Sequence, residues 1–223
     1  MSLIGDGFST VIFRENIGSN RDQNKQQFYP VNESGFDVST VVAANAAIKK
    51  AVPDARTVLL LAKDHNLYKT QNEMFDSAES LPESRELLKS MLKGQPVSHL
   101  VLVTKFRSEA DFKFADNNYT GKGKLEGLGF YVHNSLQVED INTRNSGLGI
   151  LAPYVYIKIR LIDANTLEVI KETTQKQSHI VGITKPNESS VYVWDSMKSQ
   201  QKIELLQSLI KAAMNEGIPK LFN

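Results

Sequence analysis

Cysteine is absent from the 223-residue chain. This absence excludes disulfide bonds, thiolate metal sites and a cysteine nucleophile, and it suits a periplasmic as well as a cytoplasmic protein. No stretch approaches the roughly 18 consecutive apolar residues that a membrane-spanning helix needs. A surplus of one charge sign is also missing, because the formal net charge is +1 and the basic residues are scattered. The composition therefore provides no electrostatic field that would recruit nucleic acid or an anionic membrane surface.

The composition that is present is that of a soluble globular protein. Hydrophobic residues make up 41% of the chain and charged residues 23%, which suffices to bury a core. No internal repeat and no linker divides the sequence, so we predict a single domain over residues 1–223. No signal peptide is visible. Met1-Ser2-Leu3 resembles an artificial start, and we expect residues 1–3 to replace a natural signal or lipid-anchor segment.

The strongest local pattern lies at residues 153–177. Four apolar side chains alternate with polar or aromatic ones, which predicts a half-buried strand whose second face is in water. The apolar set is Val155, Ile157, Ile159 and Leu161, and the intervening set is Tyr156, Lys158 and Arg160. Asp163-Ala-Asn-Thr supplies turn formers, and residues 169–177 are typical of a returning strand.

Four other segments predict strands: residues 8–13, 56–62, 97–106 and 128–138. The segment 56–62 (Arg-Thr-Val-Leu-Leu-Leu-Ala) is a continuous apolar run, the pattern of a strand covered on both faces. Residues 15–36, 107–127, 142–149 and 180–194 are expected to be loops, with 107–127 and 142–149 flexible. A short edge strand at 191–194 is a further expectation.

Three amphipathic helices are predicted. Asp37 is expected to cap a helix over 38–52, Ser80 and Glu83 form a capping box before a helix over 82–93, and Asp195 is expected to cap the C-terminal helix. A short helix at 71–78 is also compatible with the sequence. Apolar stripes mark the two later helices: Leu87, Leu88, Met91 and Leu92, then Ile203, Leu206, Leu209, Ile210, Ala213 and Met214.

These elements together predict an α+β fold, in the form of a mixed α/β sandwich. A largely antiparallel sheet of five or six strands would carry about three helices on one face. The other face would be partly exposed to water.

Catalytic chemistry has one candidate, Asp64 and His65, which follow the predicted strand 56–62. Adjacent residues of an extended chain point to opposite faces, so a dyad would need a turn and a third partner. A polar strand exit is the simpler interpretation, and we predict no catalytic residues. No Gly-x-Ser-x-Gly elbow is present to favour acyl transfer.

Metal and cofactor sites are not indicated. The four histidines His65, His99, His133 and His179 lack metal-ligand spacing, and Asp6, Asp111, Asp116 and Asp140 form no paired acid and base. The segment Gly121 to Gly129 looks superficially like a phosphate loop, but Gly121-Lys is followed by Gly and then by a strand. We interpret it as a mobile loop or hairpin tip. The aromatic pairs Tyr192/Trp194 and Phe112/Phe114 are candidate protein contacts, although packing against the sheet is favoured.

The order of the elements resembles the CsgG, TolB N-terminal-domain and LpoB-like group of periplasmic proteins and lipoproteins. The similarity covers most of the chain: an early strand, the helix at 38–52, the strand 58–62, and the helix at 82–93 that leads into residues 97–103. Its most distinctive part is the alternating strand from Val155 that ends in Asp163-Ala-Asn-Thr166, similar to the group's Asp-x-Asn-Thr-Gly turn. Leu167 replaces the turn glycine, Thr104 stands where these strands usually have glycine, and no lipid-anchor cysteine is present.

This resemblance implies a bacterial cell-envelope protein, periplasmic or associated with the outer membrane, that works through protein contacts without a cofactor. It implies protein partners, with a homo-oligomer among them, and no nucleic acid. Two other functions stay open: a hydrolase or transferase at Asp64 and His65, and a small-ligand binding module between sheet and helices. Compatibility with the cytoplasm also stays open.

Overall fold

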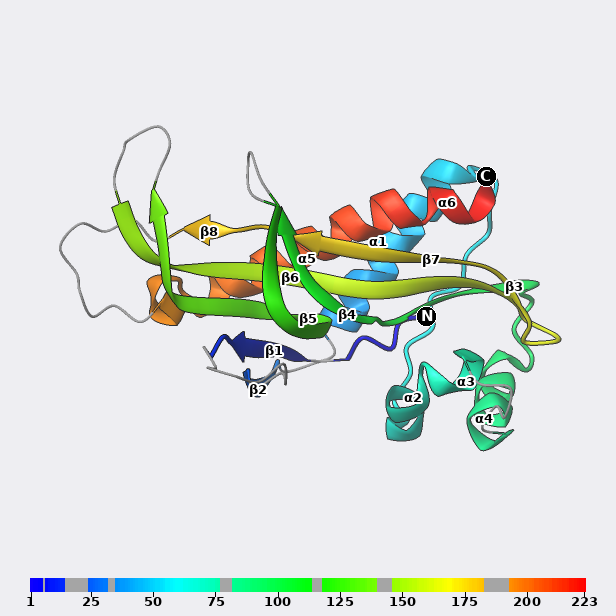
Figure 1. Ribbon diagram of the computed structural model, residues 1–223. Coiled ribbons are helices and arrows are strands. Elements are labelled where there is room, and N and C mark those ends of the chain that lie inside the picture. The colour runs from blue at the N-terminus through cyan, green and yellow to red at the C-terminus, as the bar shows by residue number, and fades with distance from the viewer. Residues whose placement is uncertain are drawn as a thin grey trace.

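The computed structural model describes residues 1–5, 7–14, 24–31, 35–76, 82–113, 118–139, 146–182 and 193–223. Its α+β architecture confirms the predicted fold class (Figure 1). The strands are β1 (Gly7–Ile12), β2 (Lys25–Pro30), β3 (His99–Lys105), β4 (Arg107–Lys113), β5 (Asn118–Glu139), β6 (Ser146–Asp163), β7 (Val169–Ser178) and β8 (Val181–Gly182). The helices are α1 (Gly35–Ala51), α2 (His65–Thr70), α3 (Glu73–Asp76), α4 (Pro82–Leu92), a 3-10 turn (Val193–Ser196), α5 (Ser199–Gly217) and α6 (Pro219–Phe222).

The long strand β6 organises the sheet. One edge of β6 pairs antiparallel with β5 along its first part and with β3 from Ile157 to Asp163, while β7 pairs along the other edge. Beyond β5, β1 pairs in parallel and β2 then pairs antiparallel with β1. The predicted hairpin at 153–177 is thereby confirmed as the β6–β7 pair.

One face of the sheet packs against α1, α5 and α6. Alternate residues of β6, from Val155 to Leu161, contact the apolar faces of these helices. Leu206, Ile210, Ala213 and Met214 of α5 are buried there, and Ile203 and Leu209 are partly buried, so the predicted C-terminal stripe is confirmed. This layer is the largest part of the core.

The alternation predicted that the opposite face of β6 would be partly exposed to water. This prediction is wrong at Tyr156 and Arg160. Tyr156 and Arg160 are both fully buried. The arm formed by β4 and the first part of β5 covers Tyr156, whose hydroxyl donates to the Asp111 carbonyl oxygen over 2.9 Å. The guanidinium of Arg160 bonds Thr104 Oγ1 and Glu172 and lies 5.3 Å from the centre of the Phe75 ring.

The helices also divide between the two faces. Leu88 and Leu92 of α4 pack with Leu100 and Leu102, which point away from α1 and α5 because strand side chains alternate. The α2–α4 group therefore covers the second face at the end where β3 lies (Figure 1). The expectation that the helices share one face is wrong in this respect.

Two segments predicted as flexible loops contain strand. Residues 107–113 and 118–127 form β4 and the start of β5, and 146–149 begin β6. Gly127 has a φ of 66° at the point where β5 changes partner from β4 to β6. A bend in β5 at this position explains why the residue is a glycine. Residues 114–117 and 142–145 lie outside the described residues.

Other boundaries also differ from the predictions. Residues 25–30, predicted as loop, form β2. The helix predicted at 71–78 is present as α3 at residues 73–76, while residues 77 and 78 lie outside the described residues, and α2 (65–70) was not predicted. Trp194 belongs to the 3-10 turn rather than to an edge strand. Asp195 lies in that turn, and Lys198 is the N-cap residue of α5. Residues 77–81, which include Ser80, are not described, but α4 itself is confirmed and Gly94 follows it with a φ of 81°.

Candidate functional site: an apolar groove between α1 and β3

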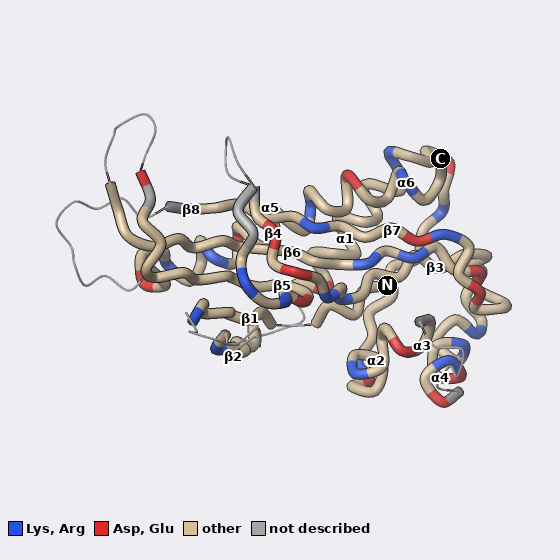
Figure 2. Tube along the Cα trace, viewed as in Figure 1, with Lys and Arg blue, Asp and Glu red and all other residues tan. Residues whose placement is uncertain are grey.

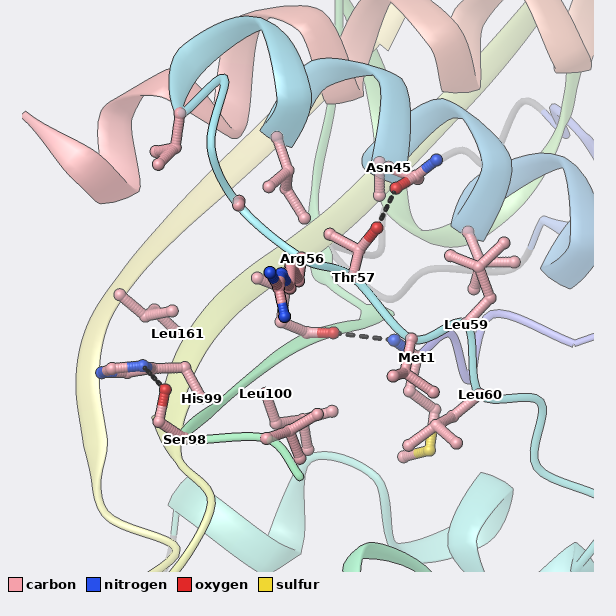
Figure 3. A pocket seen from close by; sticks show the side chains of 18 of the residues that line it. Met1, Asn45, Arg56, Thr57, Leu59, Leu60, Ser98, His99, Leu100 and Leu161 are labelled. Atoms are coloured by element: carbon pink, nitrogen blue, oxygen red, sulfur yellow. Dashed lines mark hydrogen bonds between the residues drawn. The ribbon is translucent and has the colours of Figure 1, made fainter. Parts of the chain in front are cut away.

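A groove of about 540 Å³ lies beside α1. Residues 55–60 run along it, with α1 on one side and the start of β3 on the other (Figure 3). The lining consists of Met1, Val41, Ala44, Asn45, Ile48, Val52, Ala55, Arg56, Thr57, Val58, Leu59, Leu60, Leu92, Pro96, Val97, Ser98, His99, Leu100, Val101, Leu161 and Phe222. Its wall is predominantly apolar, and its volume lies within the range of ligand-binding clefts.

Residues 56–62 are the main error of the sequence prediction. They do not form a strand covered on both faces: residues 55–60 have no regular structure, and Leu61 makes an isolated parallel bridge to Ser2. Val58 is 45% exposed and Leu59 is 49% exposed. Three apolar side chains of a run that the sequence marks for burial, Val58, Leu59 and Leu61, are thus exposed, whereas Leu60 is partly buried and Ala62 is buried.

Two valines of α1 are also exposed. Val38 and Val42 are one helical turn apart, and both are exposed. Thr57 Oγ1 donates to Asn45 Oδ1 over 2.6 Å and fixes the extended segment against the helix. We call the exposed side chains on these two elements the apolar strip: Val38, Val42, Val58, Leu59 and Leu61.

Few polar side chains reach the groove. Ser98 Oγ lies 2.9 Å from His99 Nδ1, and the Arg56 side chain lies near the middle of the view in Figure 3. Arg56 is exposed, no ion pair of the described residues involves it, and no acidic side chain belongs to the lining. Elsewhere the two charge signs are interspersed along the chain (Figure 2). The groove thus combines apolar walls with an uncompensated cation.

The N-terminal residues close one end of the groove. The Met1 amino group donates to the Val101 carbonyl over 2.8 Å, and Leu3 is fully buried. Asp37, predicted to cap α1, instead lies in its first turn and binds this segment. Its Oδ1 accepts from Ser2 Oγ and the Ile4 and Gly5 amides, and its Oδ2 accepts from the Tyr68 hydroxyl. Burial raises the pKa of the Asp37 carboxyl, although these bonds oppose the shift.

Asp64 and His65 lie outside the groove lining. Asp64 is the N-cap of α2, where its Oδ1 accepts from the Asn66 amide over 2.7 Å. His65 begins that helix and is exposed. A capping carboxylate beside a solvent-exposed imidazole is accounted for by local structure.

The other predicted candidates are dispersed. His133 is buried against Phe13, with ring centres 4.1 Å apart, and His179 follows β7. Of the four aspartates only Asp111 is described, and its backbone bonds Tyr156. Within the described ranges, no three His, Asp or Glu side chains gather as metal ligands would. His99 alone of these candidates lines the groove.

The aromatic candidates pack inward where they are described. Phe112 is fully buried, and Trp194 stacks on Tyr29 with 5.5 Å between ring centres. The Lys202 ammonium lies 3.8 Å from the centre of the Trp194 ring, and desolvation lowers the pKa of this lysine. Phe114 and Tyr192 lie outside the described residues. Packing against the sheet, the favoured interpretation, is confirmed for Phe112 and Trp194.

Comparison with known proteins gives no family. No protein-family model matches the chain, and no curated protein matches its sequence. None of the described helices combines the length and apolar character needed to cross a bilayer. The CsgG, TolB and LpoB-like resemblance therefore stays a prediction, and the groove is the feature on which a function can be argued.

Proposed function

We propose that the protein is a non-enzymatic interaction or assembly protein of the bacterial cell envelope that acts through protein contacts. The observation that carries this proposal is the apolar strip. Exposed apolar residues are common singly, but several on two elements that border an apolar groove, with Val58 and Leu59 in the groove lining, are characteristic of an interaction surface. The proposed cell-envelope location rests on the resemblance of the element order and of the turn after β6.

The position of the strip supports contacts with another protein. Val38 and Val42 project from a helix, and Val58 and Leu59 from an extended segment fixed beside it by the Thr57–Asn45 bond. A partner would cover both elements at once, and each buried methylene would contribute about 0.8 kcal/mol. Large gains would come from exposed apolar side chains that also line the groove, such as Leu59.

Photo-crosslinking tests this proposal. A benzoylphenylalanine at position 59 should give one discrete adduct in the cells that make the protein, and the same label at Ile170 on β7 should not. Ile170 is the matched control because it is also apolar and about half exposed. The purified partner should then bind the unlabelled protein, with Leu59→Lys weakening binding at least tenfold and Ile170→Lys leaving it unchanged. A protein that gives no specific adduct at 59, or an adduct whose purified partner ignores Leu59→Lys, would refute protein contact through the strip.

A small-ligand function is the second candidate, because the groove has the volume of a ligand site and a single arginine among apolar walls. Its ligand would be an apolar carboxylate. Saturable decanoate binding that disappears in Arg56→Gln, while decanol binding is retained, would favour this candidate. The hydrolase alternative at Asp64 and His65 gains no comparable support, since the Asp64 carboxylate is occupied as a helix cap.

A further inference from the structure

We propose that the protein has a separate binding site for a free acidic amino acid, in a small polar pocket beside the bend of β5. The two carboxylates of this ligand bind Lys105 and Arg107, and its ammonium binds Glu126. The pocket shares no lining residue with the groove. This inference therefore goes beyond the proposed function, which concerns contacts with another protein.

The pocket has a volume of about 280 Å³ and lies where five strands come together. β1 and β2 form one wall, the passage from β3 to β4 forms another, and β5 and β6 form the third (Figure 1). Apart from Val11, the side chains that line it are polar: Ser9, Gln26, Lys105, Arg107, Glu126 and Tyr154. Such a wall suits a small polar ligand.

The bend of β5 leaves room for one of the two cations. β5 pairs with β4 up to Glu126 and with β6 from Gly127 onward. The side chain of Lys105 passes over this point, because a Cβ atom on Gly127 would lie 3.0 Å from its Cγ and 3.4 Å from its Cε. A residue with a side chain at position 127 would therefore displace the lysine from the pocket.

The charged side chains of the pocket are not paired with one another. Arg107 and Glu126 are opposite residues in the β4–β5 register, yet no ion pair between described residues involves either of them. The same holds for the Lys105 ammonium. Two cations and one carboxylate thus line the same small space with their charges available to a ligand.

Tyr154 adds a buried donor to this set. Its side chain is 1% exposed, and no hydrogen bond within the described part of the chain uses its hydroxyl. Burial, and then the neighbouring Tyr156 and Glu126, raise the pKa of this hydroxyl, so it keeps its proton at neutral pH. A buried hydroxyl without an acceptor destabilises the folded protein, and a ligand carboxylate would supply the acceptor.

The charges and the volume specify the class of ligand. Each carboxylate of an acidic amino acid has a cation to bind, and its ammonium has Glu126, so every charge gains a charge-assisted hydrogen bond. Inorganic phosphate would instead place a like charge beside Glu126. Clefts for drug-sized ligands span about 300–1,000 Å³, so a pocket of about 280 Å³ suits a molecule as small as an amino acid.

Calorimetric titration of the full chain with L-glutamate and L-aspartate tests the proposal at low ionic strength, where charge pairs are least screened. At least one of them should bind saturably. Glutarate and succinate, which lack only the ammonium, should bind about tenfold more weakly than the matching amino acid. Glu126→Gln should abolish this preference. Glu109→Gln should retain it, because Glu109 is an exposed carboxylate on the same arm but outside the pocket.

The cations and the tyrosine are tested separately. Lys105→Met keeps the apolar stem over Gly127 and should weaken binding of the amino acid and of the matching diacid about tenfold, whereas Lys124→Met, outside the pocket, should not. Tyr154→Phe should weaken both ligands about three- to tenfold. Urea denaturation shows whether each variant is folded.

Three results would overturn the proposal. The first is no saturable binding of either amino acid up to about 10 mM. The second is binding of the diacids or of inorganic phosphate as tight as that of the amino acids, which would indicate a site for simple anions. The third is an equal loss in the Glu126→Gln and Glu109→Gln variants, which would indicate nonspecific attraction. The proposal of protein contact at the apolar strip would stand after any of these results, because the crosslink at position 59 tests it independently.

Discussion

Asp37 binds the N-terminal segment through its side chain. Its carboxylate is buried and collects four hydrogen bonds, from Ser2, Ile4, Gly5 and Tyr68. The sequence identified it as a helix cap, since an aspartate before an apolar periodic stretch is a normal N-cap signal. The partners of Asp37 are distant in the sequence, 32–35 residues away on one side and 31 on the other, so local pattern could not reveal its actual role.

The raised pKa of Asp37 predicts a specific pH dependence of stability. Because burial raises the folded-state pKa above the unfolded value near 3.8, the folded protein holds its proton over a pH range in which the unfolded chain has lost it. Stability contributed by this group therefore falls as the pH rises from about 3.8 through the folded-state pKa, and stays constant above it. Asp37→Asn should remove this fall, because the asparagine side chain does not titrate. The variant should still fold, since its amide oxygen can accept from Ser2 and the two amides, and the Tyr68 hydroxyl can still donate to the Ala62 carbonyl.

Urea denaturation between pH 3.5 and 7 measures this effect. The difference in free energy of unfolding between Asp37→Asn and the parent should move in favour of the variant as the pH rises. Asp163→Asn is the control with the opposite sign. Bonds from the Thr166 and Asn165 amides lower the pKa of Asp163, so its contribution is lost as the pH falls. A pH-independent difference for Asp37→Asn would show that the carboxyl titrates normally in the folded protein.

At the scale of elements, the features predicted best from the sequence were those that depend on a single local periodicity of apolar residues. The α5 stripe and the β6–β7 alternation are local, and both are confirmed. The turn after β6 contains a departure with a physical reason. Leu167 has a φ of 59°, a conformation that costs a non-glycine residue about 1–2 kcal/mol, but its side chain is buried in the α4 core. Burial of a leucine contributes about 1.5–3 kcal/mol, which explains why leucine is tolerated where the resembling turns have glycine.

The glycines at 121–129 were misinterpreted because composition cannot distinguish a mobile loop from close packing. A Cβ atom on Gly129 would lie 2.1 Å from the Ser9 carbonyl oxygen and 2.5 Å from the Tyr154 hydroxyl. The Ser9 carbonyl cannot yield without disturbing the parallel pairing of β1 with β5. The glycine is therefore needed by the sheet.

Substitution of Gly129 tests this conclusion. Gly129→Ala should lower the free energy of unfolding by about 3 kcal/mol, at the upper end of the usual cost of overpacking. Gly35→Ala is the matched control, because a Cβ at the start of α1 meets nothing within 4 Å. Chemical denaturation of both variants gives the comparison. A Gly129→Ala protein as stable as Gly35→Ala would mean that the β1–β5 contact is looser than the structure shows.

At the scale of the whole molecule, sequence patterns gave the class of the fold but not the second layer. The alternation in β6 predicted a wet face because Tyr156, Lys158 and Arg160 carry polar atoms, yet Tyr156 and Arg160 are buried by elements from elsewhere in the chain. The groove was missed for the converse reason. The run 56–62 has the composition of a buried strand, and only the three-dimensional arrangement shows that it borders an unfilled place. The continuous apolar character of residues 56–62 was nevertheless the feature of the sequence that could have drawn attention to the groove.

Native-state hydrogen exchange distinguishes apolar segments that are buried in the sheet, such as β6, from apolar segments that are exposed beside the groove, such as residues 58–59. Amides of β6 between Ile150 and Ile162 are paired on both edges or buried on both faces, so their exchange should require global unfolding and report the full free energy of unfolding. Amides of Val58 and Leu59 have no partner among the described residues and should exchange at rates close to those of an unfolded peptide. Slow exchange at Val58 and Leu59 in the isolated protein would mean that the run 56–62 is already paired, and the groove would then be filled rather than open to a partner. The contrast between β6 and residues 58–59 therefore decides whether the apolar strip is a free surface, the premise from which protein contact at this face follows.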